Sequence, residues 1–125
     1  RQRQMCIRDS TDPVPVLWAS DISVLPSYKE GFPLSTVESM LCGTATIRTN
    51  TSGAHDVIQD GQTGVIVPIG DIDQLTEKIM ELIDNPPLRQ SMVNLAYQRA
   101  QSEFSAERMA EHTLQTYERV LHEFA

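Results

Sequence analysis

The sequence has no long hydrophobic run and fewer basic than acidic residues. No apolar stretch approaches the roughly 20 residues that a membrane-spanning helix requires, so we expect no membrane span. The 125 residues include 10 Lys and Arg against 17 Asp and Glu, a formal net charge of -7. Because nucleic-acid-binding proteins usually carry a basic patch, this balance argues against a nucleic-acid partner. Any bound phosphate would have to be held by local geometry and not by overall charge.

Residues that could hold a metal ion lack the required spacing. Cys6 and Cys42 fit neither a disulfide framework nor a zinc motif, and the three histidines are not spaced for zinc. Asp71-Ile-Asp73 matches a metal-holding D-x-D pattern, but it opens an amphipathic helix, where Asp71 suits the N-cap position. We therefore expect no metal ion and no cofactor.

Residues 1–10 differ in character from the rest of the chain. They show neither helical nor strand periodicity, and they lack the apolar middle region of a signal peptide. We interpret them as a non-native leader. Residues 11–125, a length typical of one domain, are assigned to a single folded unit.

From Thr11 onward, short apolar runs alternate with longer amphipathic stretches. This alternation is typical of the α/β class, here a Rossmann-like parallel sheet flanked by helices. The strands are expected at residues 22–25, 44–47 and 64–67. Between them, the pattern predicts a helix over residues 34–42, ended by Gly43, and a helical turn at residues 53–58.

Three amphipathic helices are expected after Pro68. The first begins after Asp71 and stops at residues 85–87, the second starts near Leu88, and the third follows a Ser105 cap. Each helix carries an apolar stripe that we expect to face the core. The stripes consist of Ile72, Leu75, Ile79, Leu82 and Ile83; of Met92, Leu95, Ala96 and Ala100; and of Met109, Ala110, Thr113, Leu114, Tyr117, Val120 and Leu121.

The connection after the first expected strand is the candidate binding segment. In an open α/β sheet, ligands bind outside the carboxyl ends of the strands, and this loop lies there before entering a helix. The backbone N–H groups from Phe32 to Thr36 should be unpaired in the first helical turn, where the helix dipole favours a diphosphate. Gly31 would allow a ligand close to the backbone, and Pro33 would shape the turn.

Two carboxylates flank this loop, and each has two interpretations. Glu30 can accept hydrogen bonds from sugar hydroxyls, and Glu38 can accept them from the paired hydroxyls of a ribose. Alternatively, Ser35-Thr-Val-Glu38 fits an S-x-x-E capping box, in which Glu38 only caps the helix. Glu30 could likewise be a solvated loop acid next to Lys29. Spacing alone leaves both interpretations open.

The ordered motifs of this chain resemble a known family. Residues 26–34, Pro-Ser-Tyr-Lys-Glu-Gly-Phe-Pro-Leu, continued through Glu38-Ser-Met-Leu-Cys-Gly43, are similar to the donor-site signature of the retaining glycosyltransferases of family 4. These enzymes have the two-domain GT-B architecture. The similarity continues through residues 43–47, 52–53, 60–68 and 70–73 and covers residues 11 to about 117.

The resemblance implies a role for each residue of the loop. Glu30 would be the catalytic residue that contacts the hydroxyls of the donor sugar, and Glu38 would bind the ribose. The residues expected to line the sugar and diphosphate are Gly31, Phe32, Pro33, Leu34 and Ser35, with Pro33 offering no N–H.

The resemblance also implies a reaction and its partners. The enzyme would transfer a sugar with retention from a nucleotide diphosphate sugar to a glycan or lipid-linked acceptor, in the cytoplasm and peripherally on the inner face of the membrane. A missing N-terminal domain would hold the acceptor, and an Arg and a Lys that neutralise the diphosphate would lie outside this chain. We therefore expect the chain alone to be inactive. The competing hypothesis is a non-catalytic nucleotide-sugar-binding module.

Three positions depart from the family pattern. Ala45 replaces a frequent proline, and Asp56 replaces a glutamate, which shortens the reach of the carboxylate. Arg48 stands at the end of a strand where small residues are common, and it could be a ligand or partner contact.

Overall fold

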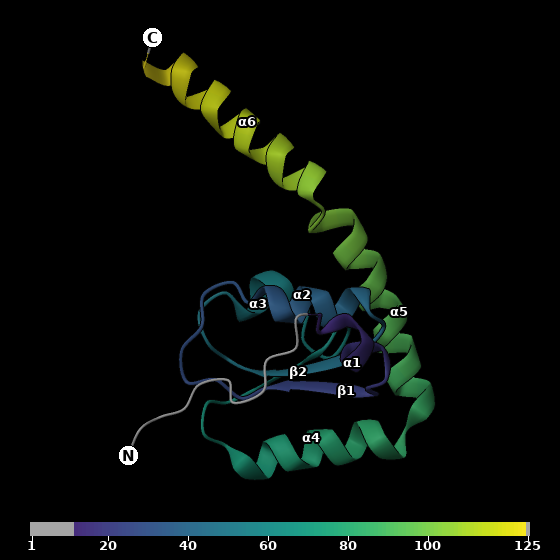
Figure 1. Ribbon diagram of the computed structural model, residues 1–125. Helices are drawn as coiled ribbons and strands as arrows, with labels where there is room; N and C mark the ends of the chain where they lie inside the picture. The colour runs from purple at the N-terminus through teal and green to yellow at the C-terminus, as the bar shows by residue number, and fades with distance from the viewer. Residues whose placement is uncertain (1–11, 125) are drawn as a thin grey trace.

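The computed structural model describes residues 12–124 as an α/β fold, which confirms the predicted class. Figure 1 shows a parallel sheet with α2 and α3 over one face, α4 across the other, and α5 running along the side. The strands are β1 (Ile22–Leu25), β2 (Ala45–Thr49) and β3 (Val65–Val67). The helices are α1 (Val14–Trp18), α2 (Leu34–Leu41), α3 (Ala54–Val57), α4 (Ile72–Asp84), α5 (Pro86–Glu103) and α6 (Ala106–Phe124). The proposed leader at residues 1–10 lies outside the described residues.

The three strands are parallel, as the sequence predicts, and they lie in the order β1-β2-β3. β2 is central and all five of its residues are buried. It runs to Thr49, two residues beyond the predicted end, because Arg48 and Thr49 pair with Leu25 of β1 and with Ile66 and Val67 of β3. The central strand therefore ends in two buried polar residues, Arg48 and Thr49.

Two hydrophobic clusters pack on opposite faces of the sheet. The cluster under α2 and α3 contains Val37, Met40, Val57, Ile58, Ala96 and Ala100, with Ile66 packed against it. The cluster toward α4 contains Ala45, Ile47, Val65, Val67, Leu82 and Met92. Since α5 contributes to both clusters, it ties the two layers together along one side of the sheet.

The predicted capping residues Gly43, Asp71 and Ser105 are confirmed, whereas the predicted start of α5 is wrong. Gly43 follows α2 at φ 74°, in the left-handed region that glycine adopts without strain. Asp71 accepts a hydrogen bond from the Gln74 N–H at 2.9 Å, and Ser105 accepts one from the Arg108 N–H at 3.2 Å. α5 begins at Pro86 and not near Leu88, because a proline in the first turn has no N–H to leave unpaired.

Several residues predicted to face the core are exposed. On α4, Leu82 is buried while Ile72 and Ile83 are exposed, and on α5 Leu95 is exposed. Every residue of the predicted α6 stripe is exposed, because α6 projects away from the body of the domain (Figure 1). Periodicity identifies which residues share a helix face, but it does not say whether another element covers that face.

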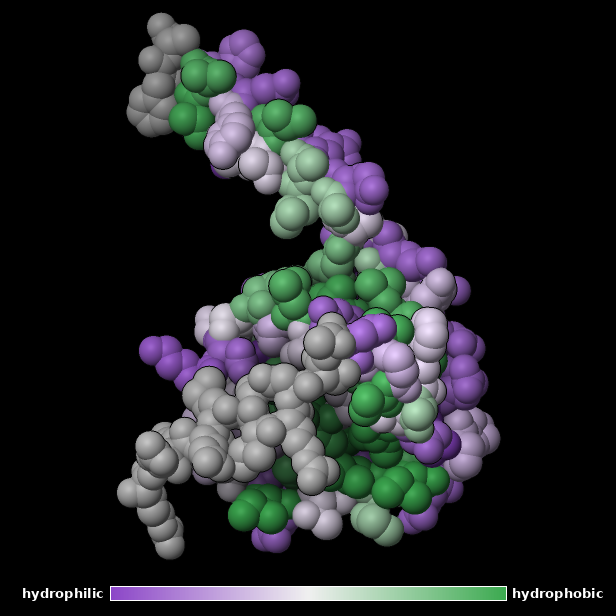
Figure 2. All heavy atoms as spheres, in the orientation of Figure 1, coloured by the Kyte–Doolittle hydropathy of each residue, from purple (hydrophilic) through white to green (hydrophobic). Residues whose placement is uncertain are grey.

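The surface of α6 keeps its amphipathic character. Figure 2 shows hydrophobic side chains along the helix, with hydrophilic ones beside them on its other side. Met109, Leu114, Tyr117 and Leu121 are each more than 60% exposed. No helix between residues 12 and 124 is long and apolar enough to cross a membrane.

Candidate functional site

The loop over residues 26–33 lies at the carboxyl edge of the sheet, between β1 and α2. The end of β2 anchors it, because the Thr49 hydroxyl donates its proton in a hydrogen bond to the Ser27 carbonyl oxygen and also lies 3.4 Å from the Leu25 carbonyl oxygen. The first residues of the loop are thus fixed to the central strand. This is the edge at which ligands bind in parallel α/β sheets.

The capping-box interpretation of Ser35 and Glu38 is wrong. The N-cap of α2 is Pro33, which is buried and extended at φ -78° and ψ 111°, and no side chain caps the helix. Ser35 is therefore the second helical residue, and Glu38 lies one turn inside α2. With Pro33 as the N-cap, the helix starts two residues earlier than it would with a Ser35 cap.

The first turn of α2 presents unpaired backbone donors. Among the described residues, no group accepts a hydrogen bond from the Leu34 or Ser35 N–H, whereas the Thr36 N–H bonds to the Pro33 carbonyl at 3.1 Å. The expectation of free donors therefore holds for Leu34 and Ser35 and is wrong for Thr36. With the dipole of an eight-residue helix behind them, these N–H groups can bind an anion.

The Glu30 carboxylate is half-buried and held in place. The Ser27 hydroxyl donates to Glu30 Oε1 at 2.8 Å, and Ser27 is itself tied to Thr49. Glu30 is therefore not a fully solvated loop acid. Ser27 thus connects the Glu30 carboxylate, through its hydroxyl, to Thr49 at the end of the central strand, through its carbonyl.

The Glu38 carboxylate is exposed and makes no side-chain hydrogen bond within residues 12–124. Its charge acts on Cys42, one turn later. Burial raises the pKa of the Cys42 thiol, and the negative charges of Glu38 and Asp12 raise it further. Glu38 thus has both acceptor oxygens available for hydroxyl donors.

Two glycines meet beneath the loop. Gly53 has φ 73°, and a Cβ added there would lie 2.6 Å from the Gly31 carbonyl oxygen. A Cβ added at Gly31 would meet no atom within 4 Å, so no contact with the described residues requires glycine at this position. The tight turn before α3 is therefore the support on which the loop rests. The sequence marked this Gly turn as a family motif but gave no sign of the contact.

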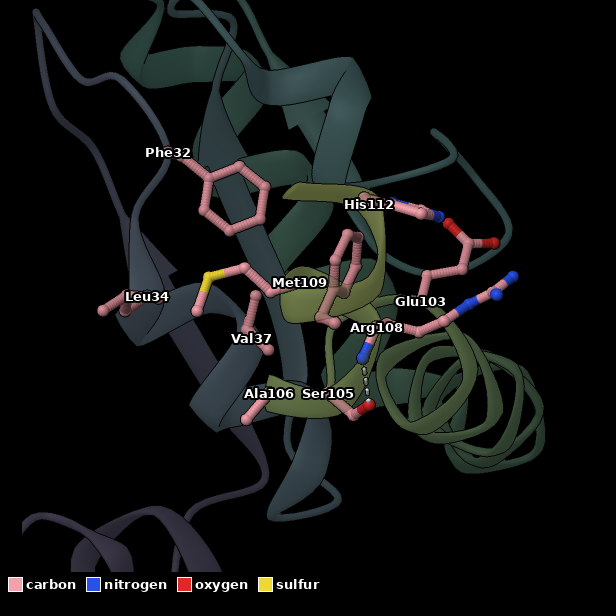
Figure 3. Close-up of a pocket in the computed structure, with 10 residues that line it drawn as sticks. Phe32, Leu34, Val37, Glu103, Ser105, Ala106, Arg108, Met109 and His112 are labelled. Atoms are coloured by element: carbon pink, nitrogen blue, oxygen red, sulfur yellow. Dashed lines mark hydrogen bonds between the residues drawn. The ribbon is translucent and has the colours of Figure 1, made fainter. Parts of the chain in front are cut away.

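Phe32 ties the loop to the junction of α5 and α6. Its ring lies edge-on to Phe104, with centroids 5.6 Å apart at 70°. A cavity of about 790 Å³ opens beside this pair, between the loop, α2 and the start of α6, and both Leu34 and Met109 line it (Figure 3). Phe32 and Leu34 line this cavity, but neither Glu30 nor Glu38 does. The two carboxylates and the α2 N-terminus therefore define the candidate site, and the cavity adjoins it.

Arg48 and Asp56, the two departures left open by the sequence, occupy different environments. Arg48 is 1% exposed, so it is not a surface contact for a partner protein. Asp56 is exposed, and its carboxylate lies near Gly53, with Oδ2 3.7 Å from the position of an added Cβ. No group of three His, Cys, Asp or Glu side chains in the described part of the chain could hold a metal ion.

Solved structures with the same arrangement are glycosyltransferases. Sucrose-phosphate synthase from Thermosynechococcus elongatus superposes with a TM-score of 0.78 at 28% identity, over 86% of this chain and 27% of that one. Anabaena Alr3699/HepE, solved in complex with UDP-glucose, superposes with a TM-score of 0.80 at 22% identity, over 86% of this chain and 30% of that one, and shows the fold alone. The domain therefore has the fold of the GT-B glycosyltransferases.

Sequence comparison identifies the family. Residues 5–99 match the family described as Glycosyl transferases group 1. The chain belongs to this family. An N,N'-diacetylbacillosaminyl-diphospho-undecaprenol alpha-1,3-N-acetylgalactosaminyltransferase of Campylobacter jejuni is 35% identical over 113 residues, which are 89% of this chain and 29% of that protein. The chain spans less than a third of the length of the curated relatives it matches.

Proposed function

We propose that this domain binds the nucleotide diphosphate sugar of a glycosyltransferase that transfers the sugar, with retention, to a glycan or lipid-linked acceptor. The observation that carries the proposal is the uncapped N-terminus of α2 at the carboxyl edge of the sheet, with Glu30 before it and Glu38 one turn inside it. Family membership supports the same activity.

Each part of the donor would meet a different part of the site. The diphosphate accepts hydrogen bonds from the Leu34 and Ser35 N–H groups, whose dipole also stabilises the charge that develops on the leaving phosphate. Glu38 accepts from the ribose diol, and Glu30 accepts from hydroxyls of the sugar. Gly31 lets the donor lie against the backbone, and Phe32 and Pro33 fix the shape of the loop.

The reaction requires groups beyond this chain. The bond between the anomeric carbon and the diphosphate oxygen breaks, and a bond to an acceptor oxygen forms as the acceptor loses its proton. We propose that an N-terminal domain of a longer protein supplies the acceptor site and the cations that neutralise the diphosphate. The isolated chain is then inactive, and a lipid-linked acceptor would bring the cytoplasmic enzyme to the inner membrane surface. The reaction as proposed uses neither a metal ion nor a cofactor.

The test is a donor screen on the full-length enzyme. UDP-glucose, UDP-N-acetylglucosamine and GDP-mannose are compared by binding, and release of the nucleoside diphosphate is followed with glycan and lipid-linked acceptors. Glu30→Gln should lower turnover of the donor that binds by at least about a hundredfold, the scale of a lost transition-state contact.

The matched control is Glu77→Gln, an exposed acid on α4 at the other face of the sheet. It should leave turnover unchanged. If the full-length protein binds a donor but transfers nothing with any acceptor, the enzyme proposal is wrong and a binding module remains. If no nucleotide sugar binds at all, both are wrong.

A further inference from the structure

Arg48 is a buried cation with unused hydrogen-bond donors. Its Nη2 donates to the Thr51 hydroxyl at 2.7 Å, but Nε and Nη1 are buried and have no hydrogen-bond partner among the described residues. A guanidinium remains charged at neutral pH, and an unpaired buried charge destabilises a fold strongly. Such a residue at the end of a central strand needs a compensating charge nearby.

The negative charge that acts on Arg48 is that of Glu30, which Ser27 and Thr49 connect to the end of β2. Burial lowers the pKa of the Arg48 guanidinium, and the negative charge of Glu30 raises it. Glu30 makes no ion pair within 4.0 Å in the part of the chain that the structure describes, so this attraction acts over a longer distance. In a half-buried setting such an interaction is screened much less than one on the surface.

The register of the sheet places Arg48 under the loop. Arg48 pairs with Leu25, the last residue of β1 before the loop, and with Ile66 of β3. Ile66 packs against the cluster beneath α2 and α3, and side chains opposite one another in a sheet share a face. Arg48 therefore lies on the α2 side, at the carboxyl end of the strand, where the loop crosses.

We propose that Arg48 is a positioning residue whose buried guanidinium pairs electrostatically with the Glu30 carboxylate and holds it toward the donor sugar. The part concerning the sugar rests on the function proposed above. Ser27 and Arg48 then both act on Glu30, Ser27 through a hydrogen bond and Arg48 through its charge.

The first test needs no ligand and uses the chain itself. Glu30→Gln keeps an acceptor for the Ser27 hydroxyl but removes the negative charge, so it should leave Arg48 uncompensated and lower Tm by at least about 4 °C. In an Arg48→Met background the same Glu30→Gln change should cost little, because no buried cation remains. A double-mutant cycle over these four proteins measures the coupling.

Glu38→Gln is the matched control, since Glu38 is an exposed acid close in the chain. It should leave Tm unchanged in both backgrounds. The proposal is overturned if Glu30→Gln leaves Tm unchanged, or if its effect is the same with and without Arg48.

The second test uses the full-length enzyme and the donor identified by the screen. Arg48→Met should raise KM for the sugar nucleotide roughly tenfold, the scale of one charge-assisted hydrogen bond, and leave inhibition by the parent nucleoside diphosphate unchanged. Arg48→Lys should restore part of the loss. Equal weakening of both ligands would mean that Arg48 supports the whole site and would overturn its role toward Glu30. If the wild-type enzyme binds no donor, the proposed function fails while the stability cycle still decides the charge pair.

Discussion

Replacing Gly53 with alanine should damage the loop that carries Glu30, although Gly53 itself is proposed to contact no substrate. The change adds a Cβ 2.6 Å from the Gly31 carbonyl oxygen at a residue whose φ is 73°. Since real Cβ contacts below 3.0 Å are essentially absent, the loop must move by at least 0.4 Å, the difference between 3.0 and 2.6 Å. The strain arises in the turn at Gly53, and the displacement affects the loop at Gly31, which carries part of the candidate site.

The magnitude follows from these two effects. An alanine in the left-handed region costs roughly 1–2 kcal/mol, partly offset by its less flexible unfolded state, so the net strain is about 1 kcal/mol. The forced contact adds about 1–3 kcal/mol, as other overpacked sites do. For a chain of this length we expect Gly53→Ala to lower Tm by about 8–16 °C. In the full-length enzyme, KM for the donor should rise about tenfold because the loop is misplaced.

Gly61→Ala is the matched control. Gly61 has the same φ of 73°, but an added Cβ there meets nothing within 4 Å. It should therefore show only the strain, about 4 °C in Tm, and leave donor KM unchanged. Calorimetry on the chain and donor kinetics on the full-length enzyme measure the two effects. Equal Tm losses for the two variants, with donor KM unchanged in both, would refute the role given to the Gly53 contact.

Three other predictions concern Glu38, Cys42 and α6. Glu38→Ala should lower Tm by less than about 2 °C, because Glu38 caps nothing, and it should raise donor KM more than tenfold. A large loss of Tm with donor KM nearly unchanged would instead support a capping role for Glu38. The raised pKa of the Cys42 thiol leaves less thiolate at pH 7 and slows its alkylation. In a Cys6→Ser background, Glu38→Gln should therefore speed alkylation of Cys42 about twofold. An unchanged rate would exclude this effect of the Glu38 charge. By hydrogen exchange, amides of α6 should be much less protected than those of α5; equal protection would mean that the α6 face is covered in solution.

The sequence predicted the parts of the fold that depend on local pattern. The strand positions, the parallel character of the sheet and the caps at Asp71 and Ser105 follow from periodicity and from single residues at helix ends. The capping box failed because Pro33, with its fixed φ, begins the helix before Ser35 can cap it. A four-residue motif cannot show which of two nearby residues, Pro33 or Ser35, caps the helix.

The support beneath the site could not be predicted from the sequence. The approach of Gly53 to Gly31 and the pairing of Phe32 with Phe104 join segments far apart in the chain, and neither has a local signal. Arg48 was visible only as an unusual residue at a strand end. Arg48 is buried because β2 is the central strand and extends past its predicted end.

The central claim is that the α2 N-terminus and its two flanking carboxylates bind the donor. A crystal structure of the full-length enzyme with its nucleotide sugar tests it most directly. The account predicts diphosphate oxygens within hydrogen-bond distance of the Leu34 and Ser35 N–H groups, the ribose on Glu38 and the sugar on Glu30. A nucleotide sugar seated instead in the cavity between Phe32 and Met109, with both carboxylates free of it, would contradict the account.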